Sequence, residues 1–82
     1  MYKYFVGDTK GWIEVKKSEL GGANLLGSIS TSSYQKGENI YLDEDIDFSF
    51  FLDYLGEMPD LMKIHVRDNY FDKYKRYEGG LQ

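Results

Sequence analysis

The sequence has no cysteine, a single histidine, a single proline and no long apolar run. Without cysteine, a disulfide framework and a thiolate metal site are both excluded, so packing alone has to stabilise the fold. The first seven residues carry one charge and a short apolar stretch, far from the roughly 20 apolar residues that cross a bilayer. We therefore expect a cytoplasmic protein without a membrane partner.

Aromatic residues are abundant instead. They make up 17% of the 82 residues, with eight Tyr and five Phe. Each can bury on the order of 150–250 Å², which suits a small domain that must build its core from few side chains. A chain of this length supports one core and not two. We expect a single domain over residues 1–78 and a flexible C-terminal tail at 79–82.

The first third of the chain predicts one β-hairpin. Residues 2–6 and 12–15 are rich in aromatic and β-branched residues, and they flank a turn at 8–11. Glycines then interrupt the sequence, and each costs about 1 kcal/mol relative to alanine inside a helix. Residues 17–27 are therefore expected to form an irregular connection.

A second hairpin and a helix follow. Residues 28–34 and 39–42 read as strands that flank a loop at 35–38, where Gly37 can take a positive φ. The three- and four-residue spacing of a helix face then appears at Phe48, Phe51, Leu52 and Leu55. This spacing predicts the main helix at about 46–56, capped by Asp45 or Asp47 and ended by Gly56.

The C-terminal part predicts one more strand. Residues 61–67 alternate strictly, with Met62, Ile64 and Val66 on one face and a basic face opposite. Tyrosines at helical spacing in residues 69–77 leave open a helical turn or an ordered coil. The whole pattern predicts an α+β fold: a small, mainly antiparallel sheet of four or five strands, made of two hairpins and a C-terminal strand, with one main helix packed on it.

Charge is segregated along the chain. Residues 38–60 contain eight acids and no Lys or Arg, whereas residues 61–77 contain five Lys or Arg against two acids. The acids can favour the positive end of the helix dipole, or they can steer a basic partner surface. For a partner-binding patch the candidate residues are Asp43, Glu44, Asp45, Asp47, Asp53 and Glu57.

Catalytic and metal-binding patterns fail at particular positions. Asp43, Asp45 and Asp47 open like a calcium loop, but Phe48 and Tyr54 stand where that loop needs glycine and glutamate. The single histidine, His65, lacks the partners of a zinc site or a catalytic triad, and the hydroxyl residues at 28–33 read as strand and turn residues. We expect a protein that is not an enzyme and that binds no metal or cofactor.

A nucleic-acid-binding surface is the alternative function. Cations and tyrosines are interleaved in residues 63–77, a combination that pairs with phosphates while bases stack. The candidate residues are Lys63, His65, Arg67, Lys73, Lys75 and Arg76. Against this alternative, the chain is acidic overall and carries no signature of a known nucleic-acid-binding fold.

One pattern resembles a group of small bacterial and phage proteins that has no assigned activity. It comprises Ser33-Tyr34-Gln35-Lys36-Gly37 and Tyr41-Leu42-Asp43-Glu44-Asp45-Ile46-Asp47, followed by a short aromatic helix and a basic, tyrosine-rich end. The resemblance implies a compact cytoplasmic protein, in the host cytoplasm if a phage encodes it. With the charge map, it predicts a small protein-binding module that inhibits or modulates a host or defence protein. Its oligomeric state is left open.

Overall fold

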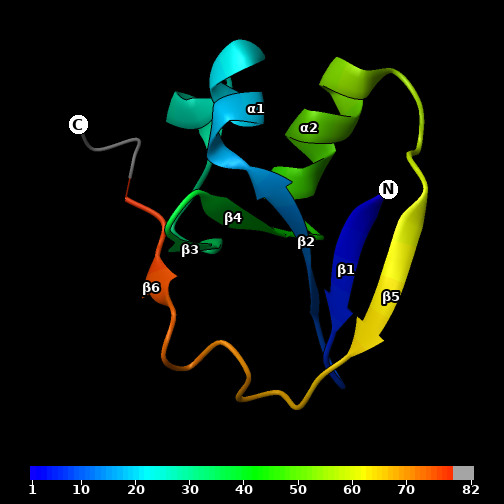
Figure 1. Cartoon of the computed structure of the whole chain (residues 1–82), viewed down its shortest axis with the longest axis vertical. Helices are drawn as coiled ribbons and strands as arrows, with labels where there is room; N and C mark the ends of the chain where they lie inside the picture. Colours follow the sequence, from blue (N-terminus) through cyan, green and yellow to red (C-terminus); the bar gives the residue numbers. More distant parts are fainter. Residues whose placement is uncertain (79–82) are drawn as a thin grey trace.

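The computed structural model describes residues 1–78 and shows an α+β fold, with a six-stranded sheet and one main helix (Figure 1). The strands are β1 (Tyr2–Val6), β2 (Gly11–Lys16), β3 (Tyr34–Lys36), β4 (Asn39–Asp43), β5 (Leu61–His65) and β6 (Lys75–Arg76). The helical elements are α1 (Lys17–Gly22), the 3-10 turn η1 (Leu26–Ser28) and the main helix α2 (Asp47–Leu55). The tail predicted at 79–82 lies outside the described residues.

The sheet is larger than predicted, and it is mixed. Its strand order is β5-β1-β2-β4-β3-β6, with antiparallel pairs except between β1 and β5. The parallel pair places Tyr2 beside Leu61 and Val6 beside His65. The sheet is mainly antiparallel, as predicted, but the expected number of four or five strands is wrong because residues 75–76 add a strand, and the parallel pairing of β5 with β1 was not predicted.

Helix α2 confirms the helix predicted at about 46–56. Gly56 ends it with a φ of 80°, a conformation that glycine adopts without strain. The predicted cap is wrong, because Ile46 holds the cap position and makes no side-chain bond there. Instead, Asp43 Oδ1 accepts the N–H groups of Asp45 and Ile46, at 2.8 and 3.1 Å, and fixes the turn before the helix.

Two connections also differ from the prediction. The segment predicted as irregular contains α1, because Leu20 is fully buried there and its burial outweighs the cost of the glycines at the helix end. Residues 29–33 contain a turn and form no strand. In this segment the side chains of Ser30 and Ser33 donate hydrogen bonds to Asp47 at the start of α2, and side-chain bonds of this kind compete with sheet pairing.

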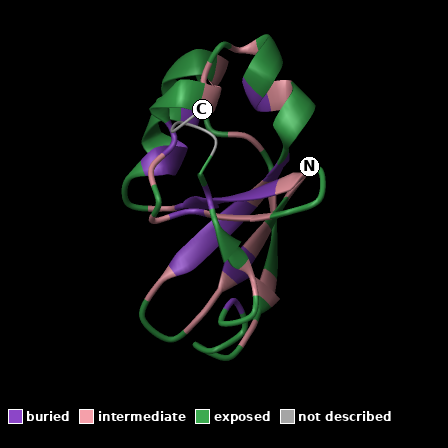
Figure 2. Cartoon of the chain, turned by 90° about the vertical axis from the view of Figure 1, so that its left-hand side faces the viewer, coloured by how far each residue is buried: buried purple, intermediate pink, exposed green. Residues whose placement is uncertain are grey.

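The two faces of the sheet are covered differently. Helices α1 and α2 lie on one side, over a core of aliphatic and phenylalanine side chains that includes Ile13, Leu42 and Phe51. Residues 66–76 run along the opposite side (Figure 1), where Phe71 packs into an aromatic cluster with Phe5. Buried residues gather in the central strands (Figure 2). Within residues 1–78, no helix has the length and apolar character needed to cross a membrane.

Candidate functional site

The acidic segment folds into a buried polar junction between β4 and α2. Asp43 and Asp47 both have 0% exposed surface. Asp47 accepts the backbone N–H of Ser30 at 3.1 Å and the hydroxyls of Ser30 and Ser33 at 2.8 and 2.5 Å. The Ser33 hydroxyl in turn accepts the N–H of Asp43 at 2.9 Å. These bonds satisfy a charge that would otherwise be costly to bury.

Asp43 is neutralised by a lysine from the first hairpin turn. Its Oδ2 forms an ion pair with Lys10 and has no other polar partner in the described part of the chain. The hydrogen bond to Asp43 raises the pKa of Lys10, because it favours the charged ammonium. Asp43 thus ties the turn before β2 to the end of β4, over 33 residues of sequence.

The structure therefore divides the predicted acidic patch. Asp43 and Asp47 cannot contact a partner while the domain is folded, so their assignment to the patch is wrong. Glu44 is half-buried and accepts a hydrogen bond from the Tyr4 hydroxyl. This bond and burial raise the pKa of Tyr4 to about 12. The exposed acids that remain of the six are Asp45, Asp53 and Glu57.

Exposed apolar side chains accompany these acids. Ile46, Phe50 and Tyr54 follow each other at four-residue intervals, along a side of α2 that borders its buried residues, and they are 45%, 44% and 56% exposed. Met58, in the connection to β5, is 64% exposed. We call Ile46, Phe50, Tyr54 and Met58, with Asp45, Asp53 and Glu57, the outer face.

The apolar part of the outer face was missed in the sequence. The spacing that placed Phe48 and Phe51 in the core leaves Phe50 and Tyr54 outside the buried strip of the same helix. That signal was available, because four aromatic residues in one short helix make an apolar face wider than one sheet can cover.

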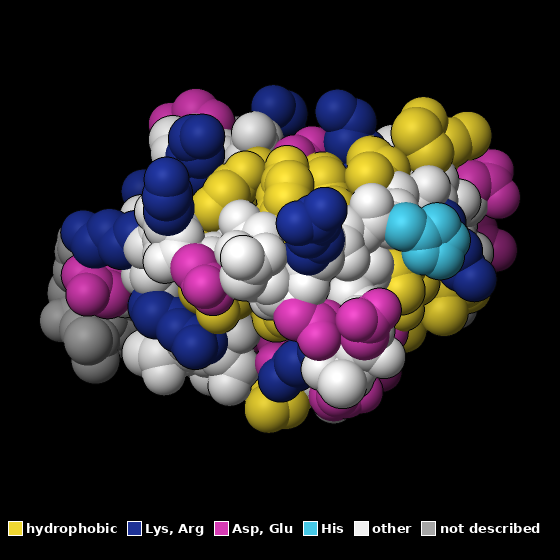
Figure 3. Space-filling view, turned by 90° about the horizontal axis from the view of Figure 1, so that it is seen from below, with side chains coloured by type: hydrophobic (Ala, Val, Ile, Leu, Met, Phe, Trp, Pro, Cys, Tyr) yellow, Lys and Arg dark blue, Asp and Glu magenta, His cyan; other side chains and the backbone are white. Residues whose placement is uncertain are grey.

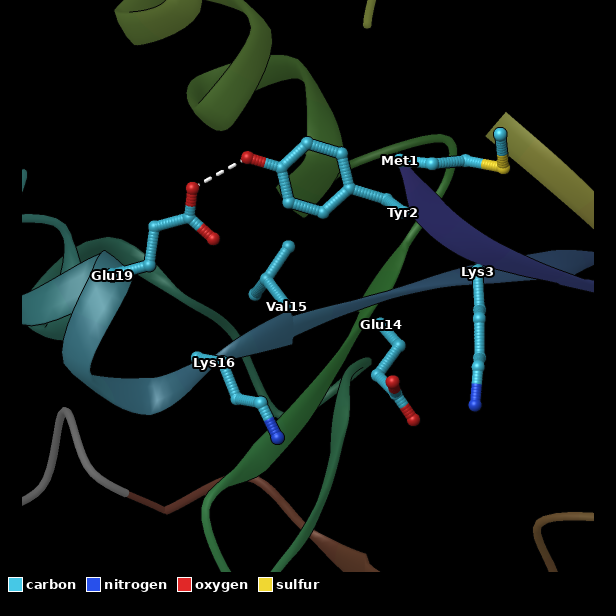
Figure 4. Close-up of a pocket in the computed structure, with 7 residues that line it drawn as sticks. All are labelled: Met1, Tyr2, Lys3, Glu14, Val15, Lys16 and Glu19. Carbon is cyan, nitrogen blue, oxygen red and sulfur yellow. Dashed lines mark hydrogen bonds between the residues drawn. The ribbon is translucent and has the colours of Figure 1, made fainter. Parts of the chain in front are cut away.

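A hollow of about 200 Å³ lies where β1 begins and β2 ends (Figure 4). Tyr2 donates a hydrogen bond to Glu19 of α1, and burial together with this bond raises the pKa of Tyr2 to about 12. Lys3, Glu14 and Lys16 point away from that pair (Figure 4). The Tyr2–Glu19 hydrogen bond thus connects β1 to α1. The residues that line the hollow do not form a set of reactive groups.

The predicted basic residues separate into two groups. Lys63 and His65 lie on β5, at one edge of the sheet, and Arg67 follows shortly after. Lys75 and Arg76 form β6, at the other edge, and Lys73 precedes them. Lys and Arg side chains gather on this second side when the molecule is seen from below (Figure 3). The six residues therefore do not form one surface.

A larger hollow lies beside β6. It measures about 320 Å³ and is lined by Gln35, Lys36, Gly37, Lys73, Tyr74 and Lys75. The sequence gives no sign that Lys36 belongs with Lys73 and Lys75, because these lysines come together only through the pairing of β3 with β6.

The groups of a hydrolytic site are far apart. Ser33 precedes β3 and His65 ends β5, and these strands are separated by β4, β2 and β1. Four strand spacings amount to on the order of 20 Å. Among residues 1–78, no three His, Asp or Glu side chains gather closely enough to hold a metal ion.

Comparison of the chain with models of protein families, with curated proteins and with solved structures finds no match. The surface geometry is therefore the basis for a functional proposal.

Proposed function

We propose that the chain is a small non-enzymatic protein-binding module that docks on its partner through the outer face. In this proposal it inhibits or modulates a host or defence protein, as small phage-encoded proteins do. The observation that carries the proposal is the row of Ile46, Phe50 and Tyr54, exposed side by side and accompanied by Asp45 and Asp53.

Large exposed apolar side chains are unfavourable unless another surface covers them. Single ones are common, but an aligned set flanked by polar residues is typical of an interaction site. Tyr and Phe lose little side-chain freedom on binding and bury large areas, so they act as interface anchors. Phe50 and Tyr54 are the two aromatic anchors that α2 offers.

The acids of the outer face favour a partner with a basic rim. No Lys or Arg occurs between residues 38 and 60 to neutralise Asp45, Asp53 and Glu57 within that segment. A symmetric dimer through this face would bring the same acids of two copies together, and like charges oppose such contact. An apolar pocket bordered by Lys or Arg is thus the complementary surface.

The buried junction supports a binding role over a catalytic one. Ser30 and Ser33 use their hydroxyls to solvate the buried Asp47, so these oxygens stabilise the fold. His65, the single histidine, is exposed on the edge strand β5, four strands away from β3.

The test compares two matched double variants. Phe50→Ser with Tyr54→Ser removes the aromatic anchors, and Met62→Ser with Tyr70→Ser removes exposed apolar area elsewhere on the molecule. Host proteins retained by the immobilised wild type are identified, and the retained partner is then purified and titrated against each variant. Loss of two anchors is expected to raise Kd about 30-fold or more, since each anchor contributes about 1 kcal/mol or more.

The control variant should bind the same partner with unchanged affinity. Equal affinity of the partner for the anchor variant and the wild type, with both folded by circular dichroism, would contradict the proposal.

A further inference from the structure

We infer that the hollow beside β6 is a nucleotide-binding site, in which Lys36, Lys73 and Lys75 hold phosphate and Tyr74 stacks on a base. This site is separate from the outer face and does not depend on the function proposed for it. The juxtaposition that carries the inference is three lysines and one aromatic residue in the lining of a hollow of about 320 Å³.

The charge around the hollow is one-sided. Three of its six lining residues are lysines, and none is an acid. Only Lys75 has an acidic partner among the described residues, an exposed pair with Glu78 at 3.5 Å, and such pairs contribute little. Like charges held close together repel each other, so a bound anion would relieve the repulsion.

The fold builds this arrangement from distant segments. β3 pairs with β6 in a register that sets Gln35 beside Lys75, which brings the turn after β3 next to the segment before β6. Gln35 accepts the N–H of Glu78 at 3.2 Å and so fixes this edge. Gly37 has a φ of 60° and no atom near the position of a Cβ, so the lining is open at the turn.

Tyr74 supplies the surface for a base. It is half-buried, and its ring is held at nearly a right angle against Tyr41, with ring centres 5.2 Å apart. The ammonium of Lys36 lies 5.1 Å from the centre of the Tyr74 ring. A phosphate is a stronger partner for this ammonium than an aromatic ring, so phosphate binding would free the ring for stacking.

Arg76 is not part of the site. Its guanidinium lies over Tyr34, 4.5 Å from the ring centre, and it donates a hydrogen bond to the carbonyl of Thr31 at 3.2 Å. Both contacts fix it to the fold. The site therefore uses two of the six residues predicted from sequence to bind nucleic acid, Lys73 and Lys75, with Lys36 added.

The experiment measures anisotropy of a fluorescent twelve-nucleotide oligo-dT at 50 and 200 mM NaCl. Three neutralised phosphates predict a slope of about −2 in log affinity against log salt for a single strand, so the fourfold rise in salt should weaken binding about 20-fold. Replacing the lysines in a Lys36→Gln, Lys73→Gln, Lys75→Gln variant should weaken binding at least tenfold at 50 mM and flatten the slope.

A matched variant removes the same number of positive charges near the opposite edge of the sheet, from β1, β5 and the segment just after β5. Lys3→Gln, Lys63→Gln and Arg67→Gln should leave the affinity within about twofold of the wild type. No binding by the wild type, or equal weakening by both triple variants, would overturn the inference.

Two further arms define the ligand. Tyr74→Leu should weaken oligonucleotide binding about fivefold or more while Tyr74→Phe keeps it, and unchanged binding by Tyr74→Leu would overturn the role of the ring. Competition by thymidine monophosphate would show that a free nucleotide suffices, whereas competition only by unlabelled oligo-dT would assign a strand. Inorganic phosphate as effective as the nucleotide would contradict base recognition.

Discussion

Carboxylates in one short acidic segment have opposite roles in this protein. Asp43 and Asp47 are completely buried and bonded to lysine, serine and backbone groups, whereas Asp45 and Asp53 are exposed beside apolar side chains. The two sets are interleaved in the sequence. Charge density along a chain therefore does not measure the charge of a surface, because part of it is used to build the fold.

The largest expected effect is on the buried set. Asp47→Ala would leave the N–H of Ser30 and the hydroxyl of Ser33 without their acceptor, and it should lower the free energy of unfolding by about 3 kcal/mol. Urea denaturation followed by circular dichroism measures this loss. Asp53→Ala is the matched control and should change stability by less than about 0.5 kcal/mol. Similar losses in the two variants would remove the distinction between the sets.

Asp43 allows the two components of its role to be separated. Asp43→Ala removes the turn bonds and the Lys10 ion pair, and it should cost about 2 kcal/mol or more. Asp43→Asn keeps an oxygen for the turn and should cost about half as much. Equal stability of the two variants in urea would show that the turn bonds contribute nothing.

Tyrosine hydroxyls that bond to acids predict an alkaline limit of stability. The folded-state pKa of Tyr2 and Tyr4 is raised to about 12 from 10.0, so their bonds contribute fully below pH 10 and are lost as the pH rises towards 12. Thermal melts from pH 9 to 12 should therefore show falling stability. The double variant Tyr2→Phe, Tyr4→Phe should be less stable by about 1 kcal/mol at neutral pH and should lose less between pH 10 and 12.

If the double variant loses stability over this pH range as steeply as the wild type, other groups cause the alkaline transition.

Local patterns predict the elements of this fold better than their assembly. The aromatic and β-branched content of residues 2–6 and the spacing of Phe48, Phe51 and Leu55 are local signals, and they locate β1 and α2 correctly. The parallel pairing of β1 with β5 has no such signal, because it joins residues nearly 60 positions apart. A short helix such as α1 forms because tertiary burial of Leu20 overrides a weak local preference.

The site follows the same rule. Asp45 is exposed and Asp47, two residues later, is buried. The difference arises because Asp47 faces Ser30 and Ser33, which are distant in the sequence, and Asp45 does not. The sequence pattern at residues 33–37 and 41–47 includes Ser33, Asp43 and Asp47. In the structure these three form one hydrogen-bonded chain, so the pattern has a structural basis whatever the partner is.

The most direct test of the outer face is the association rate of the purified partner with the triple variant Asp45→Asn, Asp53→Asn, Glu57→Gln. We predict association about tenfold slower than wild type at low salt, a difference that disappears at high salt, and stability within about 0.5 kcal/mol of wild type. An unchanged association rate at low salt would contradict a binding role for the exposed acids.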